Sequence, residues 1–131
     1  MTTYHVVESE IDYEACRRLM EAEGISGDIT FPTIIALDGE NEMVGFLATR
    51  PRDDMVLAGP LVMRRDKRRP MTAIRLIDMY RTAMRNMGIR SFIFGIDSDD
   101  SFIKKGLARY FPEASPYASN GEGTFYIWPV D

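Results

Sequence analysis

The residues best suited to bind an anion form a dense basic run. Arginine or lysine occupies five of the six positions from Arg64 to Arg69, although the whole chain carries a net charge of −4. Pro70 follows directly and suits the first turn of a helix. That turn offers backbone N–H groups without intrahelical partners and the positive end of the helix dipole, which together attract phosphates. The run therefore predicts a site for a localised anion.

Two other interpretations of the basic run stay open. The run could be a solvated surface loop with no ligand. It could also contact nucleic acid, but it is short, it lies in an acidic chain and it lacks the interleaved aromatic side chains that stack on bases. We therefore favour a small anionic ligand over nucleic acid.

Other reactive side chains are sparse. Cys16 is the only cysteine and His5 the only histidine, and they fall on different predicted elements. We expect neither a Cys–His nucleophile nor a cysteine-rich zinc site, and we interpret Cys16 as a small buried helix residue. The acidic stretch from Asp97 to Ser101 could bind a metal or supply a general base, but it is more simply a helix cap. No metal site is expected.

Length and composition predict one domain covering residues 1–131. The chain has 131 residues, of which 45% are hydrophobic and 27% charged, typical of a globular protein with one core. No apolar stretch approaches the roughly 20 residues that cross a bilayer, and residues 1–5 lack signal-peptide character. We therefore expect a cytoplasmic protein without a membrane segment.

The hydrophobic pattern predicts alternating strands and helices. Strand patterns and helix patterns follow one another, separated by glycine, proline and aspartate turns. The predicted strands are residues 4–8, 33–37, 43–49, 55–63, 91–96 and 124–130, with a further strand around Tyr117. The predicted helices are a first one that begins after the N-cap Ser9 and ends near Gly24, a second over 72–87 and a third between about 102 and 111. Strands 55–63 and 91–96 are expected to be parallel neighbours joined by the second helix.

This order of elements resembles the GNAT superfamily of N-acetyltransferases over essentially the whole chain. The sharper likeness lies between Leu61 and Ile96, where a strand, a basic linker, a helix that ends in glycine and a buried strand follow one another. Residues 68–73 lie over the family's pattern of glutamine or arginine, two variable residues, glycine, one variable residue, and glycine or alanine. Arg68 and Ala73 match the ends of this pattern, and Met71 replaces its middle glycine.

The resemblance implies an α/β (α+β) fold with a mixed sheet of about six to seven strands and helices on both faces. It also implies an N-acyltransferase that uses acetyl-CoA to modify a primary amine of a small molecule or a protein. A catalytically inactive member that only binds a ligand or partner is the alternative. The acceptor stays unidentified, no membrane partner is expected, and a homodimer is left open.

The resemblance also implies site residues. In the family, the strand that here contains Gly59-Pro60 is bulged and diverges from the central strand, so a free N–H near Leu61 or Val62 could bind the thioester carbonyl. The family's catalytic tyrosine falls at Gly106 or Leu107 here, one turn before Tyr110, which is the candidate acid. Asp97 is the candidate base, with Asp54 as a second choice. The expected cofactor-binding residues are Leu61, Val62, Arg64, Arg68, Arg69, Met71, Thr72 and Ala73.

Overall fold

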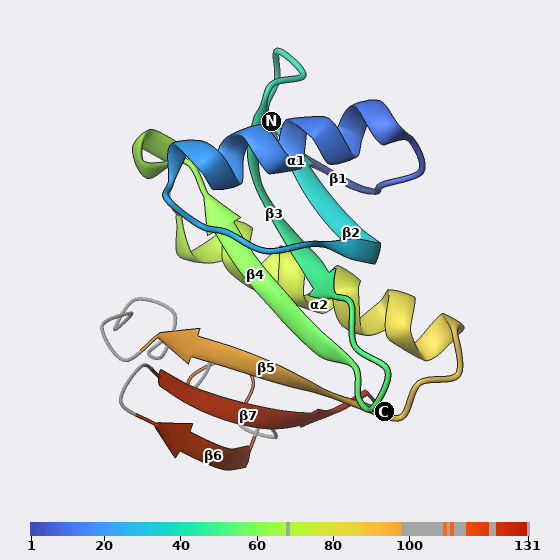
Figure 1. Ribbon diagram of the computed structural model, residues 1–131. Coiled ribbons are helices and arrows are strands. Elements are labelled where there is room, and N and C mark those ends of the chain that lie inside the picture. The colour runs from blue at the N-terminus through green and yellow to red at the C-terminus, as the bar shows by residue number, and fades with distance from the viewer. Residues whose placement is uncertain (68, 98–108, 110, 112–114, 121–122, 131) are drawn as a thin grey trace.

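In this computed structural model, seven strands of the described residues form one mixed sheet at the centre of the molecule. The structure describes residues 1–67, 69–97, 109, 111, 115–120 and 123–130. The strands lie in the order β1-β2-β3-β4-β5-β7-β6. Their bounds are β1 (Thr3–Val6), β2 (Thr30–Leu37), β3 (Met43–Arg50), β4 (Leu57–Met63), β5 (Ser91–Asp97), β6 (Ser115–Asn120) and β7 (Gly123–Pro129). The sheet confirms the predicted fold class (Figure 1).

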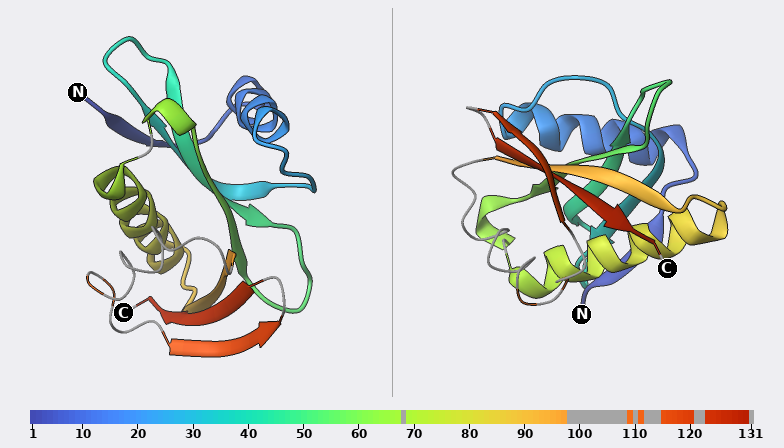
Figure 2. Two further views of the ribbon diagram at one scale, coloured as in Figure 1. Left: turned by 90° about the vertical axis from the view of Figure 1, so that its left-hand side faces the viewer. Right: turned by 90° about the horizontal axis from the view of Figure 1, so that it is seen from below.

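Two helices cover opposite faces of the sheet (Figure 2). Helix α1 (Glu10–Ala22) contributes Cys16 and Met20 to a core that includes Phe46 and Val62. Helix α2 (Pro70–Asn86) covers the other face, in the larger of the two cores. A short 3-10 turn η1 (Arg65–Lys67) connects β4 to α2. The predicted third helix lies outside the described residues, apart from Arg109 and Phe111.

Helix α1 begins and ends where its sequence predicts. The Ser9 hydroxyl accepts a hydrogen bond from the Asp12 N–H at 3.3 Å, which satisfies one of the free donors of the first turn. Gly24, just beyond the last turn, has a φ of +71°, which glycine adopts readily. Burial raises the pKa of the Cys16 thiol to about 12. Cys16 therefore stays a protonated core residue, as expected.

Strand β2 begins three residues earlier than the predicted strand. The sequence predicts a loop over residues 24–32, because two glycines and Pro32 lie between periodic segments there. In the structure Pro32 lies inside β2, and the register with β3 shifts between Thr30 and Ile34. An irregularity at this point lets the strand continue without the missing N–H.

Helix α2 is fixed to the sheet by a buried hydrogen-bond relay. Tyr80 is fully buried, and its hydroxyl lies 2.6 Å from the Thr49 hydroxyl of β3. The Thr49 hydroxyl donates its single hydrogen to the Pro32 carbonyl at 2.8 Å, so Tyr80 must be the donor to Thr49. Burial raises the pKa of Tyr80 well above its usual range, which keeps this donor protonated. The relay connects α2 to both β3 and β2.

Strands β4 and β5 are parallel neighbours, which confirms that prediction. Their described pairing is short: Leu57 pairs with Ile93 and Ala58 with Phe94, both near the start of β4. The strands then diverge toward their C-terminal ends (Figure 1). On the far side, β5 pairs with β7 along its whole length.

Aromatic side chains connect α2 to the second half of the sheet. The Phe92 ring of β5 packs edge-on against Tyr80, with ring centroids 5.1 Å apart, and lies nearly parallel to the ring of Trp128. Phe111 also packs against the Trp128 ring at 4.9 Å. The Arg85 guanidinium donates to the Val130 carbonyl at 2.7 Å.

Among the described residues, no helix is long and apolar enough to cross a membrane.

The relay makes a prediction about stability. Tyr80→Phe removes one buried hydrogen bond and should lower the free energy of unfolding by about 0.5–1.5 kcal/mol. Thr49→Val keeps the shape but leaves both the Tyr80 hydroxyl and the Pro32 carbonyl unpaired, so it should cost more, about 1–3 kcal/mol. Urea unfolding of both variants measures the difference. A larger loss for Tyr80→Phe than for Thr49→Val would contradict the donor order of the relay.

Candidate functional site

The second half of β4 presents backbone N–H groups on the side where β5 diverges. Arg64 N–H donates to the Val44 carbonyl of β3 at 2.9 Å. Because the hydrogen-bonding direction alternates along an antiparallel pair, Val62 also faces β3, opposite Phe46. The N–H groups of Leu61 and Met63 therefore point to the other edge, where the described residues of β5 provide no ladder partner.

The sequence analysis expected a free N–H at Leu61 or Val62, and the register separates these two residues. The Val62 N–H faces β3, and the Val62 side chain lies in the α1-side core. The Leu61 side chain packs against the α2-side core, and its N–H faces the diverging edge. Met63, which the sequence analysis left out, presents a second N–H in the same direction. Its position two residues after Leu61 in a strand is the signal that could have identified it.

Gly59 lets β4 change course just before this segment. Its φ is +132°, a backbone conformation that side-chain-bearing residues rarely adopt. A Cβ built on Gly59 meets no heavy atom within 4 Å, so the constraint comes from the backbone and not from crowding. Between Leu47 and Thr49 the register of β3 with β4 shifts at the same level. The strand thus carries the irregularity that Gly59-Pro60 predicted.

The N-terminus of α2 follows β4 after one short turn. Arg69 is the N-cap residue and makes no side-chain cap hydrogen bond. Pro70 has no N–H, and the first helical hydrogen bond runs from the Ala73 N–H to the Arg69 carbonyl at 3.3 Å. The N–H groups of Met71 and Thr72 are thus the free donors of the first turn. The side chains of Thr72 and Ala73 are buried, so these residues offer only backbone to a ligand.

The described basic residues of the run are not equally available. Arg64 forms ion pairs with Asp66 at 2.8 Å and with Glu42 at 3.6 Å. Arg65 pairs with Glu23, beyond the end of α1, at 3.1 Å. Lys67 and Arg69 are exposed and form no ion pair with any residue that the structure describes. Arg68 lies outside the described residues. Arg69 is therefore the described arginine most available to an anion at the helix N-terminus.

Met71 stands where the resemblance places the middle glycine of the motif, and the residue is 49% exposed. A glycine there would leave the free N–H groups open to close approach. Met71 instead adds a flexible thioether chain at this position. The substitution noted in the sequence thus lies directly at the candidate anion site.

The proposed catalytic residues are only partly described. Asp97 is the last residue of β5, where its backbone pairs with Gly123 of β7. Tyr110 lies outside the described residues. Asp54, the second choice for the base, is exposed and forms an ion pair with Arg52 at 3.1 Å, which holds the pKa of its carboxyl below the usual range. Among the described residues, no group of three or more His, Cys, Asp or Glu side chains could hold a metal ion.

Comparison with solved structures finds the same fold in several acetyltransferases. A NatC complex bound to Gag peptide and CoA includes a chain with a TM-score of 0.73 at 15% identity, with 99% of both chains covered. The ribosomal-protein-S18-alanine N-acetyltransferase of Escherichia coli gives 0.70 at 11% identity, covering 100% of this chain and 95% of that chain. N-acetylglutamate synthase of Neisseria gonorrhoeae, complexed with coenzyme A and N-acetyl-glutamate, gives 0.69 at 11%, covering 100% of this chain and 35% of that chain.

No protein-family model matches the chain, and no curated protein matches it in sequence. The structural likeness nevertheless extends over the whole chain. The protein has the fold of the GNAT superfamily of N-acetyltransferases.

Substitution of Gly59 tests whether the course of β4 depends on a positive φ at this residue. Gly59→Ala should lower the free energy of unfolding by about 1–3 kcal/mol, because alanine is strained at this φ. Gly88→Ala is a matched control, since Gly88 has a φ of +79° and equally free space, but lies beyond the far end of α2. Urea unfolding should show a loss for both variants, whereas amide chemical shifts of residues 61–63 should move only in Gly59→Ala. Unchanged stability of Gly59→Ala would contradict the requirement for a positive φ.

Proposed function

We propose that the chain is a single-domain, acyl-CoA-dependent N-acyltransferase that transfers an acetyl group to a primary amine of a small molecule or a protein. One observation carries the proposal: the N–H groups of Leu61 and Met63 lie on the diverging edge of β4. This edge leads, through one short turn, to the free N–H groups that begin α2. A thioester carbonyl could bind the N–H groups at the β4 edge, and the pyrophosphate of the same cofactor could bind the N–H groups that begin α2.

The β4 edge suits acyl transfer. When an amine attacks a thioester, negative charge develops on the carbonyl oxygen, and fixed backbone N–H donors stabilise that charge without having to reorient. The Leu61 N–H is our candidate donor, with the Met63 N–H beside it. Val62 lies between them, holds β4 against β3 and contributes to the α1-side core.

The α2 N-terminus suits a pyrophosphate. The N–H groups of Met71 and Thr72 and the positive end of the helix dipole attract phosphate oxygens. Arg69 and, beyond the described residues, Arg68 are proposed to add charge-assisted hydrogen bonds. Arg64 is proposed to contribute less than Arg69, because its guanidinium already pairs with two carboxylates. Ala73 keeps the first helical turn packed on the core.

The remaining chemistry is a pair of proton transfers. The amine must lose a proton before or during attack, and the departing sulfur must gain one. We propose Asp97 as the base, because it ends the strand that borders the diverging edge, and Tyr110 as the acid.

We also propose that the protein is cytoplasmic. Whether it forms a homodimer is left open.

A protein that binds CoA without transferring an acyl group is the alternative, and Met71 favours it. Met71 is about half exposed and carries a side chain where the family pattern has none. The two functions are distinguished by incubating the protein with acetyl-CoA and a panel of primary amines and measuring release of free CoA thiol. Release that depends on both protein and amine supports transfer. Saturable CoA binding without release supports the alternative.

Removing Arg69 tests the anion site. Arg69→Ala should weaken CoA binding by about 1–2 kcal/mol, because it removes a charge-assisted contact that is partly screened by solvent. Arg90→Ala removes one exposed positive charge beyond the opposite end of α2 and should leave the affinity unchanged. Titration calorimetry at low and high salt measures both variants, and the wild-type affinity should fall as salt rises. Equal, salt-insensitive affinities in all three proteins would show that the run is only a solvated loop.

Restoring the family's glycine tests whether Met71 obstructs the site. Met71→Gly should raise the CoA affinity severalfold, although glycine in the first turn costs up to about 1 kcal/mol of helix stability. Met71→Ala is the matched control that separates the thioether chain from the Cβ atom. A gain in both variants identifies the chain beyond Cβ as the obstacle, and a gain only in Met71→Gly identifies Cβ. Unchanged or weaker binding in both variants contradicts the idea of an obstructed site.

A further inference from the structure

One ion pair ties the turn η1 to the end of helix α1. The Arg65 Nε donates to a carboxylate oxygen of Glu23, the C-cap residue of α1, at 3.1 Å. The two residues are 42 positions apart in the chain. The Glu23 side chain is only 15% exposed, whereas the Arg65 side chain is 87% exposed. The pair thus joins a mostly buried carboxylate to an arginine of the basic run.

The Glu23 carboxylate lies where a negative charge is unfavourable. The C-terminal end of a helix carries a partial negative charge, and a carboxylate that is mostly removed from water loses much of its hydration. The last turn of α1, which is fully described, contains no basic residue. In the described part of the chain, Arg65 is the ion-pair partner of Glu23. This pair therefore differs from one between two exposed side chains, which contributes little.

Glu23 is a fixed point on the side of α1. Its N–H donates to the Leu19 carbonyl at 3.0 Å, and the Ile25 N–H donates to the Met20 carbonyl at 2.8 Å. These hydrogen bonds close the C-terminal end of the helix. The backbone that carries the carboxylate is thus held independently of Arg65.

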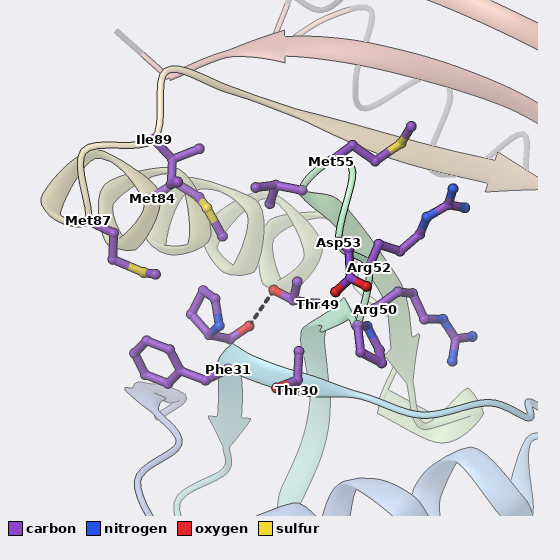
Figure 3. Close-up of a pocket in the computed structure, with 13 residues that line it drawn as sticks. Thr30, Phe31, Thr49, Arg50, Arg52, Asp53, Met55, Met84, Met87 and Ile89 are labelled. Carbon is purple, nitrogen blue, oxygen red and sulfur yellow. Dashed lines mark hydrogen bonds between the residues drawn. The ribbon is translucent and has the colours of Figure 1, made fainter.

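The loop that follows Glu23 is held as well. Arg50, at the end of β3, donates to the Asp28 carbonyl of this loop at 3.2 Å. A Cβ atom on Gly27 would lie 2.5 Å from the Arg50 Nη1, so the guanidinium packs directly against this glycine. In Figure 3, which shows a pocket at this end of β3, the Arg50 guanidinium extends away from Phe31. The loop therefore leaves Glu23 little freedom to follow a movement of η1.

The linker between β4 and α2 has few other attachments. The Arg64 N–H donates to the Val44 carbonyl of β3 at 2.9 Å, and Thr72 is buried in the first turn of α2. Of the described residues between Arg64 and Thr72, Arg65 alone forms a hydrogen bond or ion pair with another segment of the fold. The donors of the proposed site lie on both sides of this linker, at the β4 edge and at the start of α2. Arg65 thus holds the linker between the two groups of donors.

We propose that Glu23 is a positioning residue for the proposed acyl-CoA site. Through Arg65 it holds η1, and with it the approach to the first turn of α2, in the arrangement that receives the anion. A turn that is held before binding does not have to be ordered when the ligand arrives, so less binding free energy is lost. The inference rests on the proposed function, because it concerns the affinity of that site for CoA.

Two alanine variants at the end of α1 test this role. Glu23→Ala removes the pair, and Glu21→Ala is the matched control, because it removes an exposed carboxylate that has no described ion pair from the last turn. Loss of a negative charge alone favours binding of an anion. Positioning predicts the opposite sign: Glu23→Ala should bind CoA about three- to tenfold more weakly than wild type. Glu21→Ala should bind CoA equally or slightly more tightly. Titration calorimetry measures all three proteins.

Two further measurements separate positioning from a general loss of stability. In the ligand-free proteins, the ¹⁵N order parameters of η1 should fall in Glu23→Ala and stay unchanged in Glu21→Ala. In an Arg65→Ala background, Glu23→Ala should cause no further loss of CoA affinity, because the two residues act as a unit. Spectra without ligand verify that each variant is folded.

Three results would overturn the positioning role. They are equal CoA affinities of Glu23→Ala and Glu21→Ala, unchanged order parameters of η1 in Glu23→Ala, and a further loss of affinity in the Arg65→Ala background. A wild-type protein that does not bind CoA would give a different result, because it would overturn the proposed function and this inference with it.

Discussion

The structure depends on how helix α2 joins two halves of a sheet that barely pair with each other. Strands β4 and β5 share two described residue pairs, and the strands on either side of them form longer ladders. Tyr80 compensates for the short ladder, because its hydroxyl reaches β3 and its ring packs on Phe92 of β5. Side-chain packing from one helix thus fixes the orientation of the second half of the sheet where backbone pairing does not.

This arrangement also explains where the candidate site lies. A strand that loses its neighbour leaves N–H groups exposed along one edge, and the connection from β4 brings a helix N-terminus close to that edge.

Much of the fold could be predicted from the sequence because the local signals were strong. Ser9 caps α1, and the apolar spacing from Ala73 to Met84 coincides with the buried face of α2. Pro32 was misplaced in a loop because glycine and proline usually mark loops, whereas a register shift in β2 accommodates Pro32 inside the strand. The relay from Tyr80 through Thr49 to Pro32 joins residues far apart in the chain, so no local pattern reveals it. The roles proposed for Asp97 and Tyr110 stay predictions.

A site built from backbone N–H groups places little constraint on amino-acid identity. Any residue except proline supplies the same donor, so positions such as Leu61 and Met63 can change in evolution while the arrangement of donors is kept. What must persist is the course of the backbone, which here depends on Gly59 and on the packing of α2. A chain can therefore match no family model in sequence and still have a TM-score of about 0.7 with acetyltransferases at 11–15% identity.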